Sequence, residues 1–590
     1  MQIKLSDYVA EFLASCNVDT VFAISGGASL HLIHSVEAHP DIQLVCPHHE
    51  QGAAMAADGY ARVNRKIGVA IATSGPGATN LITGIACSFY DSVPVLYITG
   101  QVSTFRNVGD TKVRQIGFQE TPIVDICRPI TKYAISLKDS KLIRYELEKV
   151  YWIMRTGRPG PVVLDIPDNL QREIIETENL TSYKELINSS ILYRNILDSK
   201  NDILNSLALS KRPIVIAGWG IHLAGVENEF REFVETLNIP VAFTWAAADL
   251  FTEDHPLALG RFGTHGMRHT NFAVQNADLV LSLGSRLDTK ATGTPINSFA
   301  RKAKKIVVDI DPNELGKFEK FDLSIDLLIE CDLREFFKSF NQVELIGNSC
   351  DTNEWLKCNK SWRVIFNDFD KGKLVSNEAV NPYTFFEKLS KTADEKATIV
   401  VDTGCSIAWS MQAWHFKGSQ RLYHDFNNTA MGWALPASIG IWFANNRKEQ
   451  LICVVGDGSF MVSIQELSTA KQHKIPLKIF LINNQGYAMI RQTQEQWFES
   501  NYVASSSKSD LLFPNFEKLA HSFGYEYECI NDNKNIEDKL QSLLSKSCQT
   551  ICEVKVGHDS RVIPQVKYGR PNEDMEPLLP REIFKANMII

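Results

Sequence analysis

An aspartate and an asparagine stand where they could share a metal ion. Gly456-Asp457-Gly458 directly follows the apolar run LICVV, and Asn483-Asn484 ends the next such run, 27 residues after Asp457 (484 − 457). Because both runs read as strands of a parallel sheet, the two motifs are expected at one edge of that sheet, facing the same crevice. Magnesium prefers oxygen ligands, which suits Asp457, the Asn484 amide oxygen and a nearby backbone carbonyl.

The same segment could also hold phosphate. Gly458-Ser459 opens a helix-like stretch, whose free N–H groups and positive dipole end would favour a diphosphate that completes the magnesium coordination. A lone Gly-Asp-Gly, however, is most often only a tight turn. The functional prediction therefore depends on the second motif at the matching distance.

Two further segments have both a functional and a plain interpretation. Glu50 lies in the run HHEQG, where an apolar segment enters a helix of small residues, and it could simply suit the helix dipole. Met431, in the run TAMGW, could be an ordinary core methionine. The neighbouring His48 or His49 could assist a proton transfer or be structural. Residue type alone leaves these alternatives open.

Taken together, these segments resemble the motifs of the thiamine-diphosphate enzymes, the family that includes acetolactate synthase and pyruvate decarboxylase. By this resemblance, magnesium is bound by Asp457, Asn484 and the backbone carbonyl of Gly486. The resemblance also implies that the cofactor is contacted in this half of the chain by Thr429, Met431, Gly456, Gly458, Ser459, Tyr487 and Met489. Met431 would wedge under the thiazolium ring, and the Thr429 carbonyl would bind the 4′-amino group, although many relatives have glycine at the Thr429 position.

The resemblance gives Glu50 a catalytic role. In the family, the glutamate of an HEQG-like run accepts a hydrogen bond from pyrimidine N1′, which favours the imino tautomer that removes the C2 proton of the thiazolium. The remaining implied positions are Gln119 as a second catalytic residue, Phe118 beside the substrate, and Gly27, Pro76 and Asn80 as cofactor contacts. Because the glutamate and the GDG motif of one family site come from two subunits, the resemblance implies a homodimer or homotetramer.

Further matches extend the resemblance over nearly all 590 residues. They are TSGPGATN (73–80), GFQETPIVDICRPITK (117–132), GRPGPVVLDIP (157–167) and VVDIDPNELGK (307–317). Their sequences are most similar to those of the acetolactate synthase branch. The middle of the chain resembles the domain that holds FAD in that branch, with candidate contacts at Gly218, Arg286, Asp309 and Asp311. Some relatives have this domain with another nucleotide or with none. A plain structural loop therefore remains the alternative.

Two positions depart from the acetolactate synthase pattern. Thr493 stands where that branch has a tryptophan beside the active site, and Lys290 stands where it has an arginine that takes part in acceptor recognition. A lysine is a point charge and an arginine a planar fork, so the exchange changes how a carboxylate is bound. Together the two changes predict a wider, more polar acceptor pocket, able to admit something larger than pyruvate, such as a keto sugar carried on a nucleotide.

Short apolar runs alternate with helical stretches three times along the chain. The pattern runs through residues 18–167, restarts at RPIVIAGWG and again at TIVVDTG, and predicts an α/β fold of three doubly wound parallel-sheet domains. We assign residues 1–175 to a pyrimidine-binding domain, 190–340 to a central FAD- or nucleotide-binding-like domain, 375–560 to a diphosphate- and magnesium-binding domain, and 561–590 to a C-terminal tail. The prolines of the tail indicate a surface strap.

Composition excludes several classes of protein. With 44% hydrophobic and 22% charged residues the chain is globular, and a net charge of −8 provides no cationic field for nucleic acid. No apolar run is long enough for a membrane span, and the N-terminus lacks a signal-peptide pattern, so we expect no membrane partner and a cytoplasmic location. The 12 cysteines contain no CxxC pair, which fits a reducing compartment.

The sequence therefore predicts a carboligase that uses thiamine diphosphate and Mg²⁺. It would decarboxylate a 2-oxo acid, pyruvate first, and transfer the two-carbon unit to a carbonyl acceptor, either a second 2-oxo acid or a larger keto sugar or aldehyde. Simple decarboxylation and a non-catalytic paralogous subunit are the alternatives, although a silent copy has no chemical reason to keep Glu50, Asp457 and Asn484. A dinucleotide-dependent oxidoreductase is disfavoured, because no strand is followed by a convincing G-x-G-x-x-G.

Overall fold

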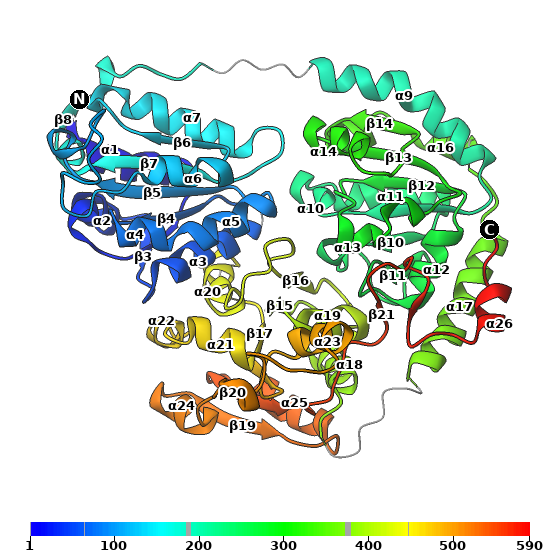
Figure 1. Cartoon of the computed structure of the whole chain (residues 1–590). Helices are drawn as coiled ribbons and strands as arrows, with labels where there is room; N and C mark the ends of the chain where they lie inside the picture. The colour runs from blue at the N-terminus through cyan, green and yellow to red at the C-terminus, as the bar shows by residue number, and fades with distance from the viewer. Residues whose placement is uncertain (1, 64, 185–189, 348, 372–378, 446–447) are drawn as a thin grey trace.

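Three parallel six-stranded sheets, each flanked by helices, make up the protein (Figure 1). This computed structural model describes residues 2–63, 65–184, 190–347, 349–371, 379–445 and 448–590. The α/β fold with three doubly wound sheets is as the alternating pattern predicts. The predicted boundary at residue 375 lies outside the described residues.

The first sheet has the strand order β3-β2-β4-β5-β7-β6. In that order the strands are Gln43–Val45, Thr20–Ala23, Gly68–Ala72, Val95–Gln101, Val162–Pro167 and Tyr133–Ser136. Its helices are α1 (Leu5–Ser15), α2 (Leu30–Ala38), α3 (Glu50–Arg62), α4 (Pro76–Asn80), α5 (Ile82–Tyr90), α6 (Ile123–Cys127), α7 (Ile143–Arg155) and α8 (Asp168–Gln171). A short antiparallel pair, β1 (Gln2–Lys4) and β8 (Ile174–Glu176), joins the start of this domain to its end.

The central sheet has the order β11-β10-β9-β12-β13-β14. These strands are Ala258–Arg261, Val241–Phe243, Pro213–Ala217, Leu279–Leu283, Lys304–Asp309 and Leu327–Glu330. The accompanying helices are α9 (Ser190–Leu209), α10 (Gly220–Ala224), α11 (Glu227–Leu237), α12 (Arg268–Asn276), α13 (Thr289–Thr292), α14 (Pro312–Gly316), α15 (Leu333–Lys338), α16 (Gln342–Gly347) and α17 (Asn353–Lys371).

The third sheet has the order β16-β15-β17-β18-β20-β19. Its strands are Arg421–Tyr423, Thr398–Val401, Leu451–Gly456, Lys478–Asn483, Thr550–Lys555 and Glu526–Ile530. The helices are α18 (Pro382–Thr392), α19 (Cys405–Ala413), α20 (Ala434–Ala444), α21 (Asp457–Ser463), α22 (Glu466–Gln472), α23 (Ala488–Trp497), α24 (Phe516–Ser522) and α25 (Ile536–Ser545).

The first and third domains share one apolar core, centred on the contact between α3 and α20. Glycines allow the two helices to touch. A Cβ on Gly440 would stand 1.8 Å from the Ala56 carbonyl oxygen, and one on Gly59 would stand 2.5 Å from that of Ala437. The central domain has apolar clusters of its own. It meets the other two domains largely through polar contacts, which is typical of interfaces between domains.

The tail runs from the third domain across to the central one (Figure 1). It contains the antiparallel pair β21 (Gln565–Val566) and β22 (Met575–Glu576) and the helix α26 (Arg581–Ala586). Buried Arg268 of α12 donates to the Met575 and Pro577 carbonyl oxygens of the tail, at 3.1 and 2.8 Å. The tail is thus fastened to the central domain. None of the helices in the described ranges is long and apolar enough to cross a bilayer.

Candidate active site

Each sheet reverses its strand order at one point, and the predicted site residues gather at these three points. The reversals lie between β2 and β4, β9 and β12, and β15 and β17. In open parallel sheets, the carboxyl ends of the two strands at such a reversal leave a crevice in which ligands bind. The loops that follow these strands contain Gly27 and Pro76 in the first domain, Gly218 and Arg286 in the central domain, and Asp457 in the third.

In the third domain, Asp457 organises the loop that carries the predicted metal ligands. One carboxylate oxygen accepts from the backbone N–H groups of Asn484 and Gly486, both at 3.1 Å, and the other accepts from that of Gly458 at 2.8 Å. Burial raises the pKa of Asp457 to about 6, in spite of these bonds. The side-chain oxygen of Asn484 is buried and accepts no hydrogen bond in the described structure. Buried amide oxygens normally have a partner, and an oxygen of this kind is chemically able to ligate a cation.

Arg491, which no motif in the sequence singles out, supports this loop from its buried side. Its guanidinium is fully buried and donates to the carbonyl oxygens of Asn484 at 3.0 Å, Gln485 at 3.3 Å and His558 at 3.2 Å. Gly486 allows the loop its shape, since its φ is +148° and a Cβ there would stand 2.2 Å from the Ser505 carbonyl oxygen. The sequence signal that could have identified Arg491 is an arginine at a buried position of the helix that follows Asn483-Asn484.

Open space suited to a diphosphate lies beside the loop that carries the predicted metal ligands, which is called the metal loop below. Gly404, with φ +82°, begins α19 after β15, and a Cβ there would meet nothing within 4 Å. A Cβ on Gly456 would meet only the Ser406 hydroxyl, at 3.9 Å. A Cβ on Gly458 would collide with the Tyr487 ring at 2.2 Å, so Tyr487 packs directly against the start of α21. Gly404 and Gly456, which follow or end the two strands at the reversal, therefore leave open space at the starts of α19 and α21, where helix N–H groups are free.

Two carboxylates hold the Thr429–Trp433 segment. Asp402 accepts from the backbone of Gly432 at 3.2 Å and of Ala434 at 2.8 Å, and Asp425 accepts from that of Ala430 at 2.8 Å. Thr429 adopts φ +53°, a conformation that favours the glycine found in many relatives. Met431 is only half-buried. The sequence analysis missed both carboxylates, although Asp402 is readable as the first polar residue after β15.

The first domain gathers the other predicted residues around Glu50. Its carboxylate accepts from the Asn80 side chain at 2.9 Å, and a Cβ on Gly77 would lie 3.4 Å from it. Gln119, at φ +63°, packs on Gly75 at the start of the same short helix, α4. Gly27 begins the turn after β2, whose next residue, Ala28, donates to Thr73 at 3.1 Å. The residues assigned to the pyrimidine side thus lie together.

His49 has a structural contact through its ring, and His48 has one through its backbone. The His49 ring caps α3 by accepting from the Gln51 N–H at 3.0 Å, and the His48 N–H donates to the Glu466 carboxylate at 3.2 Å. Within the described ranges, no hydrogen bond or ion pair joins Glu50 to Asp457, to Asn484 or to the Thr429–Trp433 segment. Phe118 is 84% exposed. The Glu50 segment meets the third domain instead through Glu466 of α22 and through the contact of α3 with α20.

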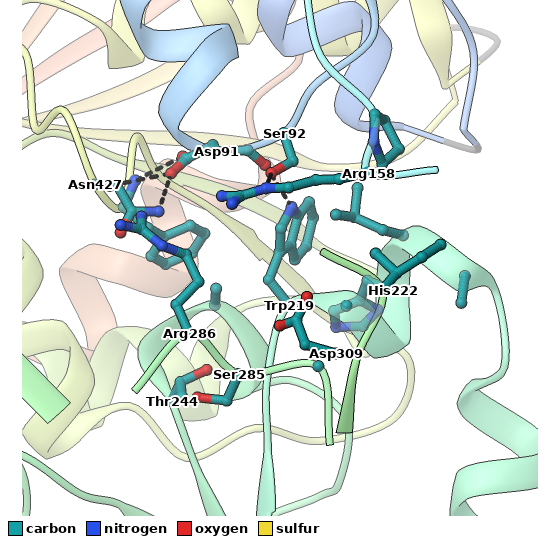
Figure 2. Close-up of a pocket in the computed structure, with 18 of the residues that line it drawn as sticks. Asp91, Ser92, Arg158, Trp219, His222, Thr244, Ser285, Arg286, Asp309 and Asn427 are labelled. Carbon is teal, nitrogen blue, oxygen red and sulfur yellow. Dashed lines mark hydrogen bonds between the residues drawn. The ribbon is translucent and has the colours of Figure 1, made fainter. Parts of the chain in front are cut away.

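A cavity of about 610 Å³ opens where the three domains meet. Side chains from all three point toward one another around it (Figure 2). Trp219 of the central domain donates to the Asp91 carbonyl oxygen at 3.0 Å, and Arg158 of the first domain pairs with Asp311 at 3.1 Å and with Glu314 at 2.6 Å. Arg286 and Asp309 line the cavity as predicted positions, and Gly218 lies just beneath it, tight against Gly284.

Comparison with known proteins decides the family. The model of the thiamine pyrophosphate enzyme N-terminal TPP binding domain matches residues 3–124, that of the central domain matches 201–338, and that of the C-terminal TPP binding domain matches 402–554. The chain belongs to the thiamine pyrophosphate enzyme family. Thiamine pyrophosphate is another name for thiamine diphosphate.

Within this family the chain is similar to acetolactate synthases. The large subunit from Lactococcus lactis is 33% identical, over 97% of this chain and 95% of its own length. The large subunit from Cyanidium caldarium is 32% identical over 96% and 95%, and acetolactate synthase 1 of Zea mays is 32% identical over 97% and 88%. The chain is thus a thiamine-diphosphate-dependent enzyme of the acetolactate synthase type, as the motifs predicted.

The two positions that depart from the acetolactate synthase pattern lie on different elements. Thr493 is exposed on α23, where its hydroxyl donates to the Met489 carbonyl oxygen at 3.1 Å. Lys290 lines the interdomain cavity with its ammonium 5.5 Å from the centre of the Trp245 ring. Among the described residues, no carboxylate lies within ion-pair distance of it, and Asp288 and Asp425 attract it from farther away. The cavity thus holds a cation beside an aromatic ring.

Proposed function

We propose that this enzyme decarboxylates a 2-oxo acid, pyruvate first, and transfers the remaining two-carbon unit to the carbonyl group of an acceptor. The acceptor is a second 2-oxo acid or a larger keto sugar or aldehyde. The observation that carries the proposal is the buried, unpartnered oxygen of Asn484 beside the Asp457 carboxylate. Carbon–carbon chemistry of this kind belongs to the cofactor, whose thiazolium ring serves as an electron sink when bound.

Magnesium and the diphosphate fit the third domain. Asp457, the Asn484 amide oxygen and the Gly486 carbonyl offer only oxygen ligands, which Mg²⁺ prefers, and diphosphate oxygens would complete the shell. No group of three or more His, Cys, Asp or Glu side chains in the described ranges could hold a metal instead. Gly456, Gly458 and Ser459 at the start of α21 would bind the diphosphate, while Tyr487 and Met489 would border the ring.

Glu50 would act on the pyrimidine end. A carboxylate that accepts a hydrogen bond from pyrimidine N1′ stabilises the form in which N1′ carries a proton. Sharing a proton in this way is the role of a general acid–base residue. Asn80 orients the carboxylate, and Gln119 would line the same space from its strained backbone position. Thr429 and Met431 would bind the cofactor from the third domain, in the roles the family resemblance gives them.

We also propose a homodimer. By the family resemblance, Glu50 of one subunit would complete the metal site of the other. Supporting this, the first domain exposes the apolar residues Phe105, Val113, Ile116 and Phe118 near Gln119. A monomer has no reason to display such a patch. A homotetramer would be a pair of these dimers.

FAD is the proposed occupant of the interdomain cavity. Its volume of about 610 Å³ lies within the range of cofactor sites. Arg158, Arg286 and Lys290 would supply positive charge for the flavin nucleotide's diphosphate, and Asp309 ends β13 at the switch-point edge of the sheet. Asp311 would act indirectly, because it pairs with Arg158.

Replacing Glu50 with Gln tests the proposal. With pyruvate, thiamine diphosphate and Mg²⁺, the wild type is expected to release carbon dioxide, and Glu50→Gln to lower that rate by at least about 100-fold. Glu354→Gln, which neutralises an exposed glutamate of α17, is the matched control. Acetolactate formation would identify pyruvate as the acceptor, and carbon dioxide without acetolactate would identify a larger one. A wild type that does not turn over pyruvate would contradict the donor assignment.

A further inference from the structure

One face of α23 forms a track that leads away from the metal loop. Met489, Thr493 and Trp497 follow one another at four-residue intervals, so they line the same side of the helix. At 1.5 Å per residue, the eight steps from Met489 to Trp497 span about 12 Å. Thr493 is exposed and Trp497 is 63% exposed, whereas Arg491 and Gln492 on the other side are buried.

The C-terminal tail forms the outer end of this track. Gln492 bonds the backbone of Val562 through both its side-chain oxygen and its side-chain nitrogen, at 2.9 and 3.0 Å, and so fastens the tail to the back of α23. The tail then crosses to the central domain, where Val566 N donates to the Thr264 carbonyl oxygen at 2.8 Å. Immediately afterwards, Tyr568 returns to Trp497, with their ring centres 6.4 Å apart and nearly perpendicular.

The same stretch of tail connects the two positions that depart from the acetolactate synthase pattern. Thr264, which holds Val566, accepts from the tail and donates its own N–H to the Lys290 carbonyl oxygen at 2.8 Å. A chain of contacts therefore runs from the Lys290 backbone through Thr264 and the tail to Trp497 on α23. A short acceptor such as a second 2-oxo acid needs only the inner end of the track. With such an acceptor, the exposed rings of Trp497 and Tyr568 at the far end would contact no part of the substrate.

Charge at the far end favours an anion. Lys567 and Arg570 flank Tyr568, and both face the one carboxylate of Glu576, at 3.6 and 2.8 Å. Two cations that share the Glu576 carboxylate therefore flank one of the two exposed aromatic rings. Flat heterocyclic bases stack on such rings, and phosphates pair with such cations.

We propose that the acceptor is a keto sugar carried on a nucleoside diphosphate, an inference that rests on the proposed carboligase function. The base stacks at Trp497 and Tyr568, the diphosphate lies by Lys567 and Arg570, and the sugar carbonyl reaches past Thr493 to Met489. The two-carbon unit bonds to the keto carbon, the carbonyl electron pair moves to oxygen, and that oxygen takes a proton. In sum, pyruvate, the ketone and one proton give carbon dioxide and an acetylated tertiary alcohol.

Nucleoside diphosphates serve as probes of the outer end. The holoenzyme is titrated by calorimetry with uridine, cytidine and thymidine diphosphates, for the wild type and for Trp497→Ala, Trp497→Phe and Tyr568→Ala. We expect at least one of them to bind, with about tenfold weaker affinity in each alanine variant and less than threefold loss in Trp497→Phe, which keeps a ring. Phe321→Ala, which truncates an exposed aromatic of the central domain, is the control and should bind as the wild type does.

Two outcomes would overturn the inference. One is that no nucleoside diphosphate binds, and the other is binding that neither alanine variant weakens, which would place the nucleotide in the interdomain cavity. Carbon dioxide release from pyruvate by the wild type is measured in the same preparations. If release is intact and binding is absent, the acceptor class is wrong. If binding behaves as expected and release is absent, the donor assignment is wrong instead.

Discussion

The metal loop and the interdomain cavity are built in opposite ways. The metal loop comes from one domain, and the Asp457 carboxylate and the Arg491 guanidinium, 34 positions apart (491 − 457), both bond its backbone. The cavity is lined by side chains from three domains, tied by ion pairs such as Arg158 with Glu314. A short, backbone-held site can appear as a sequence motif. A site assembled from distant side chains cannot, because its contacts depend on how the domains meet.

The largest effect is expected from removing the charge of the metal loop. Asp457→Asn keeps the size of the side chain but weakens its bond to Mg²⁺, so activity should fall by on the order of 100-fold or more. Calorimetry of Mg²⁺-dependent thiamine diphosphate binding measures the cause directly. Asp559→Asn, at a carboxylate whose side chain is 95% exposed, makes the same charge change and should leave binding as in the wild type. Equal binding by both variants would remove Asp457 from the metal site.

A smaller effect should follow from loosening the same loop without touching a ligand. Arg491→Lys cannot keep the hydrogen bonds to three separate carbonyl groups, so Mg²⁺ affinity should drop by about 10- to 100-fold. The free energy of unfolding should fall by about 3 kcal/mol, since buried acceptors lose their donors. Arg128→Lys, at an exposed arginine, is the matched control. A loss of stability with unchanged Mg²⁺ affinity would show that Arg491 supports the fold alone.

The cavity should respond to pH rather than to magnesium. Burial alone would raise the pKa of Glu314, but Lys317, Arg286 and Arg158 together lower it to about 2. Because the folded pKa lies below the ordinary value near 4.5, Glu314 stabilises the fold above that pH, and the contribution disappears as pH falls from about 4.5 to about 2. We expect about 2 kcal/mol, allowing for partial exposure.

Unfolding curves of the wild type and of Glu314→Gln, taken between pH 2 and 7, measure this contribution. The two should differ at pH 7 and converge toward pH 2. Glu354→Gln, at an exposed glutamate, should follow the wild type throughout. A constant difference between the wild type and Glu314→Gln would mean that the side chain acts by packing and not by charge.

The sequence predicted the strands in the middle of each sheet better than those at the edges. Runs such as LICVV and PIVIA are buried on both faces and became β17 and β9. The edge strands β6, β14 and β19 are short or partly exposed, so their apolar signal is weak, and the sequence analysis did not identify them. Pairing with a neighbouring strand, and not composition, makes these segments extended.

The candidate site shows the same division. Asp457, Asn484 and Glu50 were readable because each follows or enters a regular element at a fixed spacing. Arg491, Asp402 and Asp425 were not, since their task is to bond backbone groups whose positions come from the fold. Met431 is partly exposed and the His49 ring caps α3, and only the folded structure shows this difference in their surroundings.

By itself, the sequence determined the family and the three-sheet α/β architecture, and it placed the candidate metal ligands at strand ends. Local spacing encodes these, because strand ends and helix starts follow directly from the order of residues. Only the tertiary structure decided which side chains brace the metal loop, how three domains enclose a cavity, and that the tail returns Tyr568 to Trp497. Such contacts join residues tens to hundreds of positions apart, and chain folding alone brings them within reach.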